Sequence, residues 1–155
     1  CIKTADKNNM RVRVIGEISR LSEKFQNRIK ELEELSSTNT GLNLTIAINY
    51  GSRDEMLRAM KKMISDHDKG LLEIDDLDAD KFSSYLDTRD LPDPDLLIRT
   101  SGEQRLSNYL LWQLAYTEFY FTDVPWPDFH KKELEEAVRA YNNRDRRFGA
   151  LNDEE

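Results

Sequence analysis

The sequence is poor in cysteine and histidine, and each shortage excludes a kind of site. Among its 155 residues the only cysteine is Cys1, which excludes a disulfide framework within the chain and a multi-cysteine zinc site. The two histidines, His67 and His130, lie far apart in the sequence, and neither is accompanied by a second histidine or a cysteine. We therefore assign neither of them a metal-binding or catalytic role.

Long hydrophobic runs and an excess of basic charge are also absent. No stretch approaches the roughly 18 consecutive apolar residues of a membrane span, and no signal peptide opens the sequence. Lysine and arginine number 23 against 30 aspartate and glutamate, a net charge of −7, which argues against a general nucleic-acid binder. An anionic ligand would need a local cluster of arginines. We expect a soluble, cytoplasmic, globular protein with a core of its own.

Hydrophobic periodicity divides the chain into alternating strands and helices. Apolar or β-branched runs predict strands at 12–16, 42–49, 95–98 and 119–121. Helical spacing predicts helices at 22–35, 52–64, 82–86, in part of 106–116, and at 126–141. This alternation predicts an α/β fold with a mainly parallel central sheet flanked by helices. Such sheets bind ligands in the loops that follow the carboxyl ends of their strands.

The loop after the third predicted strand is the strongest candidate for an anion site. It contains Arg99, Arg105 and Ser107, and Gly102 lets the backbone come close to a ligand. Guanidinium groups bind phosphate oxygens through paired, charge-assisted hydrogen bonds, and hydroxyl groups add neutral donors. These residues suit a diphosphate. A solvated loop whose arginines pair with Glu103 explains them about equally well.

Glu118 is a candidate metal ligand, because it is a carboxylate among aromatic residues at the start of a strand. Burying such a group is costly unless it is paired or bound to a metal. Mg²⁺ takes one or two carboxylates together with phosphate oxygens of a substrate. An ion pair of Glu118 with Arg99 or Arg105 is the more common alternative.

Two other segments have weaker functional signals. Asn49 and Arg53 follow a predicted strand and could line a site, although an ordinary strand-to-helix turn explains them nearly as well. Arg144, Arg146 and Arg147 form a basic patch near the end of the chain. Cationic residues are favoured at the end of a helix by its dipole alone, so this patch does not by itself indicate a site.

A long run of residues resembles the signature of the cis-prenyltransferases. The run covers 95–113 (DLLIRTSGEQRLSNYLLWQ) and continues through 115–123 (AYTEFYFTD) and 126–129 (WPDF). Shorter matches are 11–16 (RVRVIG), 49–53 (NYGSR) and 146–149 (RRFG). The resemblance spans residues 10–149 and is greatest to the bacterial undecaprenyl diphosphate synthases of that family.

The resemblance implies a reaction and a set of binding residues. Members of the family condense isopentenyl diphosphate onto an allylic diphosphate such as farnesyl diphosphate, and the polyprenyl product serves as a lipid carrier in the membrane. Carried over, Arg99, Arg105 and Ser107 would hold the diphosphate of isopentenyl diphosphate, and Glu118 would help position magnesium. Arg147 and Gly149 would reach the site of the neighbouring subunit in a homodimer, which we expect to form through residues 110–124. Asn49 and Arg53 match a family motif near the site.

One family motif is missing from the sequence. The Asp-Gly-Asn-Gly-Arg loop, whose aspartate assists ionisation of the allylic substrate, does not occur in it. We therefore expect residues 1–155 to be the carboxyl-terminal portion of a single cis-prenyltransferase domain that lacks the amino-terminal strands and helices. The start at Cys1 rather than at a methionine is consistent with a partial chain. We assign no catalytic residue and expect this chain alone to be nearly inactive.

Two alternatives to an enzyme follow from the same residues. The first is a non-catalytic partner subunit of a heteromeric prenyltransferase, which would supply only the tail with Arg147 and Gly149. Retention of Arg99, Arg105, Ser107 and Glu118 argues against it, because such a subunit has no use for the pocket. The second is a phosphate-binding module, which rests on the arginine loop alone and is the weakest interpretation.

Overall fold

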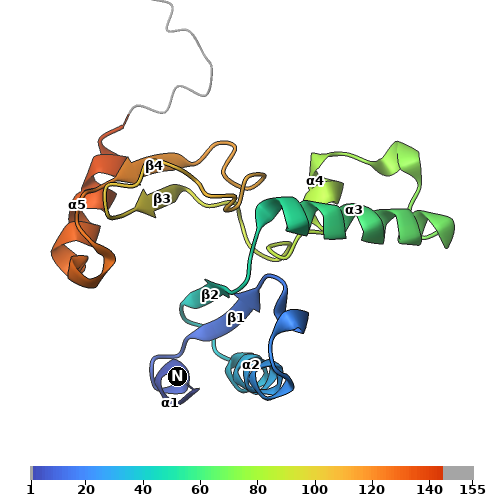
Figure 1. Ribbon diagram of the computed structural model, residues 1–155, viewed down its shortest axis with the longest axis horizontal. Helices are drawn as coiled ribbons and strands as arrows, with labels where there is room; N and C mark the ends of the chain where they lie inside the picture. The colour runs from blue at the N-terminus through green and yellow to red at the C-terminus, as the bar shows by residue number, and fades with distance from the viewer. Residues whose placement is uncertain (1, 145–155) are drawn as a thin grey trace, which may run out of the picture. The chain divides into compact units, whose positions relative to one another are not determined.

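The computed structural model describes residues 2–144, which fold as two compact units (Figure 1). Within the described residues, the first unit comprises 2–92 together with 108–111. The second comprises 93–107 and 112–144. The four residues from Asn108 to Leu111 thus pack with the first unit, although the chain on both sides of them belongs to the second.

The first unit contains a parallel pair of strands and the larger helices of the chain. Its elements in order are α1 (Ile2–Lys7), β1 (Arg11–Ile15), η1 (Ile18–Arg20), α2 (Glu23–Ser36), β2 (Asn43–Ala47), α3 (Ser52–Asp68), η2 (Ile74–Asp76) and α4 (Ala79–Ser83). β1 pairs with β2 in parallel, with Arg11 opposite Asn43 and Ile15 opposite Ala47. α2 packs against β1 and α1, and Ala5, Val12 and Ile29 are buried in this part of the unit. One part of the core of this unit therefore lies between β1, α1 and α2, and a second group of buried residues, Ala59, Met63, Leu72 and Leu86, lies in α3 and the chain that follows it.

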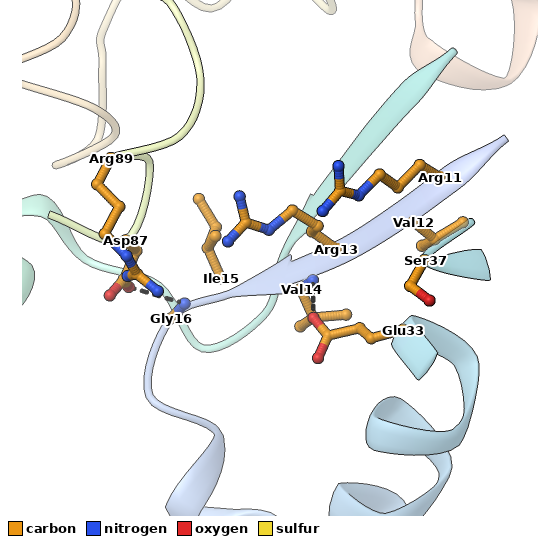
Figure 2. A pocket seen from close by; sticks show the side chains of 10 residues that line it. All are labelled: Arg11, Val12, Arg13, Val14, Ile15, Gly16, Glu33, Ser37, Asp87 and Arg89. Atoms are coloured by element: carbon orange, nitrogen blue, oxygen red, sulfur yellow. Dashed lines mark hydrogen bonds between the residues drawn. The ribbon is translucent and has the colours of Figure 1, made fainter. Parts of the chain in front are cut away.

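The edge of β1 that faces away from β2 is closed by side chains instead of a third strand. The N–H of Val12 donates to Ser36 Oγ at 3.1 Å, and the N–H of Val14 donates to Glu33 Oε1 at 2.7 Å. The N–H of Gly16 donates to Asp87 Oδ2 at 3.1 Å. Figure 2 shows the last two of these bonds beside a pocket of about 300 Å³ that runs along the strand. Satisfying these donors removes the cost of an open sheet edge.

The second unit is a smaller parallel pair covered by one helix. Its elements are β3 (Leu96–Arg99), β4 (Glu118–Phe121), η3 (Trp126–Asp128) and α5 (Lys131–Asn142). β3 and β4 pair in parallel, with Leu96 opposite Glu118 and Arg99 opposite Phe121. α5 packs against β4 and buries Ala137 completely. α5 begins with a capping box, in which the N–H of His130 donates to the Glu133 carboxylate at 2.9 Å.

The expected α/β fold with parallel strands is confirmed, and each predicted strand is present. Within residues 2–144 the strands form two separate pairs, β1 with β2 and β3 with β4. The prediction of a helix in part of 106–116 is wrong. This segment consists of turns, and Ser107, Asn108 and Leu110 in it have positive φ values. The last helix begins at Lys131 rather than at Trp126, since a separate short 3₁₀ turn precedes it. Among the described residues, none of the helices combines the length and the hydrophobicity that a membrane span requires.

Candidate functional site

The candidate anion loop begins at the carboxyl end of β3 and folds back on the chain that follows β4. Ser101 and Gly102, with φ values of 66° and 68°, form its first turn. The N–H of Ser101 donates to the Val124 carbonyl at 3.0 Å, and the N–H of Gly102 donates to the Thr122 carbonyl at 3.0 Å. A Cβ atom at Gly102 would lie 3.1 Å from Asp123 Oδ1, so a side chain here would crowd the loop. These contacts fix the start of the loop.

The three predicted diphosphate ligands differ in their surroundings. Arg99 is half-buried at the end of β3, whereas Arg105 and Ser107 are exposed. Arg105 forms an ion pair with Glu103, the contact that the alternative interpretation expects. The Arg105 side chain is still 65% exposed, and an exposed pair of this kind contributes little. A doubly charged diphosphate can therefore displace Glu103 from Arg105.

Glu118 is paired with an arginine other than the two that the sequence suggests. Arg144 Nη1 donates to Glu118 Oε2 at 2.5 Å, and Arg144 Nη2 donates to the Phe119 carbonyl at 2.8 Å. The prediction that Glu118 would pair with Arg99 or Arg105 is therefore wrong. The physical reason is the path of the chain, because α5 packs on β4 and brings Arg144 back to the start of that strand.

The structure does not bring Glu118 and Arg99 together. Glu118 lies opposite Leu96 in the register, three residues before the level of Arg99. Three residues of strand span about 10 Å, and an odd separation places the two side chains on opposite faces of the sheet. Glu118 therefore contributes to a different surface of the second unit from that of Arg99.

Glu118 is not part of a carboxylate cluster that could hold a metal ion without a substrate, as far as the described residues go. Among residues 2–144 no group of three or more histidine, cysteine, aspartate or glutamate side chains could hold a metal ion. Magnesium is commonly bound by one or two carboxylates plus phosphate oxygens of a substrate. The chemistry of one carboxylate matches an ion shared with a substrate diphosphate. The predicted tail residues Arg147 and Gly149 lie outside the described residues, as does Arg146.

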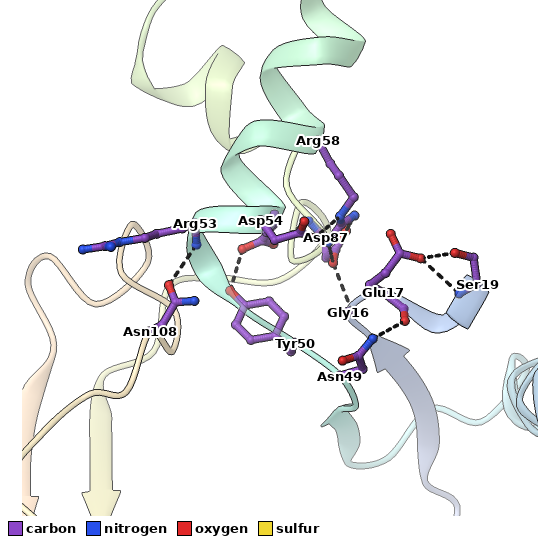
Figure 3. Close-up of polar contacts among 11 residues, drawn as sticks. Gly16, Glu17, Ser19, Asn49, Tyr50, Arg53, Asp54, Arg58, Asp87 and Asn108 are labelled. Carbon is purple, nitrogen blue, oxygen red and sulfur yellow. Dashed lines mark hydrogen bonds and ion pairs between the residues drawn. The ribbon is translucent and has the colours of Figure 1, made fainter. Parts of the chain in front are cut away.

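A second group of polar residues lies at the carboxyl ends of β1 and β2. Asn49 has a positive φ of 48°, and its Nδ2 donates to the Glu17 carbonyl at 2.9 Å. A pocket of about 230 Å³ opens here, lined by Glu17, Arg20, Asn49, Tyr50, Gly51 and Asp54. Arg53 is exposed at the start of α3 (Figure 3). Asn49 thus holds the backbone of this strand-to-helix turn, which is the structural role that the sequence offered as an alternative to a site residue.

Two acidic residues that sequence reasoning missed organise the base of this turn. Glu55 is 1% exposed, and its carboxylate accepts from the Tyr50 hydroxyl at 2.5 Å and from the Asp87 N–H at 2.8 Å. Asp87 accepts two hydrogen bonds from Arg58, at 3.0 and 2.8 Å, in addition to the one from Gly16 (Figure 3). The carboxylate of Asp87 therefore links the end of β1 to α3. The sequence does not indicate this role, because the partners of Asp87 lie far from it along the chain.

The ionisation of Tyr50 provides a test of this network. Burial raises the pKa of the Tyr50 hydroxyl, and its hydrogen bond to Glu55 raises the pKa further. An unfolded tyrosine ionises near pH 10, so the stability contributed by Tyr50 is present below about pH 10 and is lost as the pH rises further. We expect Tyr50 to remain protonated while exposed tyrosines ionise. In an absorbance titration at alkaline pH, Tyr50→Phe should remove only the last-ionising component, and loss of an early component would contradict this assignment.

Asn108 is a third residue that the sequence did not single out. Its carbonyl accepts from the N–H of Ser52 at 2.8 Å, and its Oδ1 accepts from the N–H of Arg53 at 3.0 Å (Figure 3). Asn108 therefore caps the amino terminus of α3 from a distant part of the chain. The preference of asparagine for caps and for positive φ is the one sequence signal that could have suggested this role.

Comparison with known proteins yields one family and many relatives. The family model described as "Putative undecaprenyl diphosphate synthase" matches residues 1–149. An isoprenyl transferase of Clostridium perfringens is 48% identical over 145 residues, which cover 94% of this chain and 57% of that protein. A ditrans,polycis-undecaprenyl-diphosphate synthase ((2E,6E)-farnesyl-diphosphate specific) of Vibrio cholerae is 49% identical over 153 residues, 99% of this chain and 61% of that protein.

Solved structures agree with these relatives. Lavandulyl diphosphate synthase from Lavandula x intermedia, in complex with dimethylallyl diphosphate, superposes with a TM-score of 0.89 at 42% identity, over 93% of this chain and 62% of that one. A probable undecaprenyl diphosphate synthase from Campylobacter jejuni superposes with a TM-score of 0.84 at 37% identity, over 96% and 67%. The chain spans 57% to 61% of the length of the two curated relatives named above.

Proposed function

Because the chain belongs to the family of undecaprenyl diphosphate synthases, which are cis-prenyltransferases, we propose that it functions in cis-prenyl chain elongation. In this reaction isopentenyl diphosphate is condensed onto an allylic diphosphate. The name of the Vibrio cholerae relative specifies farnesyl diphosphate, which we propose as the allylic substrate. The polyprenyl diphosphate product would be delivered to the membrane, so we propose a cytoplasmic protein that works at the inner membrane surface.

The loop from Arg99 to Ser107 carries this proposal. It leaves the carboxyl end of a parallel strand, where ligands bind in α/β folds, and it contains two arginines and a hydroxyl. We assign Arg99, Arg105 and Ser107 to the diphosphate of isopentenyl diphosphate. Their role is to bind and orient this substrate, since the arginine forks match phosphate oxygens in charge and geometry. The acid–base and ionisation steps are assigned to no residue of the described chain.

Glu118 and the end of the chain are proposed to act on the site of a second subunit. Glu118 lies on the opposite face of the sheet from Arg99, and Arg144 beside it is followed closely by Arg147 and Gly149. In a homodimer this end of the chain would meet the diphosphate held by the partner. Glu118 would then supply one carboxylate to Mg²⁺, which stabilises the charge of the diphosphate groups when bound. This arrangement makes each site depend on both subunits.

The non-catalytic partner subunit remains the second candidate. The complete diphosphate set of Arg99, Arg105 and Ser107 favours the substrate-binding role instead. Under either proposal the 155-residue chain by itself is expected to turn over little substrate.

Substitution of the two loop arginines tests the proposed function directly. Each charge-assisted contact contributes about 1.5–3 kcal/mol, which corresponds to roughly a ten- to hundredfold change in affinity. We expect Arg99→Ala and Arg105→Ala each to weaken binding of isopentenyl diphosphate by that factor in isothermal titration calorimetry. Lysine should restore only part of the affinity, because an ammonium group cannot form the bidentate contact.

The matched control is Arg28→Ala on the exposed surface of α2, where Arg28 pairs only with Glu31 in the described contacts. It removes the same charge from the same chain and should leave the affinity unchanged. Equal losses in all three variants would show a non-specific charge effect. An unchanged affinity in Arg99→Ala and Arg105→Ala would refute the assignment of the loop.

A further inference from the structure

The segment that ends the diphosphate loop has an unusual backbone. Ser107, Asn108 and Leu110 have φ values of 51°, 61° and 45°, in the left-handed region that side chains other than glycine, asparagine and aspartate seldom adopt. Three such residues within four positions persist only where surrounding contacts hold them. The contacts that hold this segment therefore also help to hold the end of the diphosphate loop in its conformation.

Those contacts come from the first residues of α3. The N–H groups of Ser52 and Arg53 donate to the carbonyl and the side-chain oxygen of Asn108, at 2.8 and 3.0 Å. In return, the N–H of Leu111 donates to Ser52 Oγ at 3.0 Å, and Ser52 is fully buried. We call these three hydrogen bonds the Ser52–Asn108 clamp. Because the first N–H groups of a helix have no partner within it, the clamp satisfies both sides at once.

The two residues before α3, Tyr50 and Gly51, also favour the observed position of the Asn108 segment. A Cβ atom at Gly51 would lie 2.8 Å from Asn108 Nδ2, so any side chain there would push the amide away. The rings of Tyr50 and Tyr109 meet edge to face, with centroids 5.7 Å apart. The lack of a side chain at Gly51 and the packing of Tyr50 against Tyr109 both favour one position of the Asn108 backbone.

We propose that Asn108 is a positioning residue, which fixes the backbone of Ser107 and the end of the diphosphate loop through the Ser52–Asn108 clamp. This inference rests on the proposed function, because it assumes that Ser107 binds the diphosphate of isopentenyl diphosphate. Asn108 follows Ser107 directly, so a fixed Asn108 determines the direction of the chain at Ser107. Holding a loop in its binding conformation before the ligand arrives reduces the entropy lost on binding.

Three variants separate the side-chain cap from the backbone conformation. Asn108→Ala removes the cap and also disfavours the positive φ, whereas Asn108→Gly removes the cap but tolerates that φ. Ser52→Ala breaks the bond to Leu111 from the opposite side, without touching the loop. Asn8→Ala is the matched control, because Asn8 is an exposed asparagine outside the diphosphate loop whose side chain donates to the Thr4 carbonyl at 2.9 Å.

Two readouts are measured on the 155-residue chain: hydrogen exchange of the Arg53 amide and calorimetric affinity for isopentenyl diphosphate. We expect Asn108→Ala to lose protection at Arg53 and to bind about tenfold more weakly, the size of one lost hydrogen bond. Asn108→Gly and Ser52→Ala should show smaller losses of affinity, and Asn8→Ala none. If Asn108→Ala prevents folding, the ranking of Asn108→Gly and Ser52→Ala against Asn8→Ala decides the question.

Lost protection at Arg53 with unchanged affinity would overturn the inference, since the clamp would then serve only the stability of α3. Affinity losses equal to that of Asn8→Ala would overturn it as well. If the unsubstituted chain protects Arg53 but binds no isopentenyl diphosphate, the proposed function fails, and the positioning role fails with it. The protection of Arg53 distinguishes these cases, because it reports on the clamp without ligand.

Discussion

Replacing Glu55 by alanine is expected to lower the free energy of unfolding by about 3–6 kcal/mol, since it removes two hydrogen bonds to a carboxylate at about 1.5–3 kcal/mol each. Glu55 is almost fully buried, so the Tyr50 hydroxyl and the Asp87 N–H would lose their acceptor in a place that water reaches poorly. A loss of this size is a large part of the total stability of an ordinary domain.

Chemical denaturation followed by circular dichroism measures this effect. Asp54→Ala is the matched control, because Asp54 precedes Glu55 on the same helix and forms an exposed ion pair with Arg58 at 3.0 Å. Such a pair contributes about 0–1 kcal/mol. Glu55→Gln should lie between the two, since its amide oxygen can still accept one hydrogen bond. Similar losses for Glu55→Ala and Asp54→Ala would mean that the buried carboxylate does not support the fold.

Replacing Gly16 by alanine is expected to have an effect of similar size. Gly16 has a φ of 109°, and a Cβ atom there would lie 2.2 Å from the Ile48 carbonyl oxygen and 3.0 Å from the Tyr50 Cα. The strained φ alone costs about 1–3 kcal/mol for a residue with a side chain. The two contacts are with backbone atoms, which cannot rotate away, so the total should reach at least about 3 kcal/mol.

Gly70→Ala separates the two causes of this loss. Gly70 also has a positive φ, 69°, but a Cβ atom there would meet no other atom within 4 Å. Gly70→Ala therefore carries only the conformational cost, whereas Gly16→Ala carries that cost and the collision with the end of β2. In thermal unfolding, the midpoint temperature of Gly16→Ala should lie well below that of Gly70→Ala. Equal midpoints would show that the turn after β1 can relax to accommodate a side chain.

The substitutions of Glu55 and Gly16 both affect the turns after β1 and β2, for which the sequence predicted a change of direction but no contacts. The sequence predicted the strands and the helix between them, because alternating apolar residues and a following glycine are local signals. It did not predict that Glu55 is buried, because an acidic residue in the first turn of a helix is normally exposed there. The partners of Glu55, Tyr50 and Asp87, make it a buried residue.

The segment 106–116 shows the same limit for secondary structure. Its spacing of apolar residues predicts a partial helix, yet three positive φ values exclude one. Local propensity is outweighed here by hydrogen bonds from the start of α3, more than fifty residues earlier in the chain. The ion pair of Glu118 was assigned to the wrong arginines for a related reason, since the return of α5 to β4 cannot be read from spacing.

The sequence by itself determined the family, the α/β class with parallel strands, and the loop that contains Arg99, Arg105 and Ser107. These depend on contiguous residues, whose order and local periodicity are present in the sequence. Only the tertiary structure decided that Glu118 and Arg99 lie on opposite faces of a sheet, that Asp87 joins β1 to α3, and that Asn108 caps α3. Each of these is a contact or a register between residues far apart in the chain, which follows from how the elements pack.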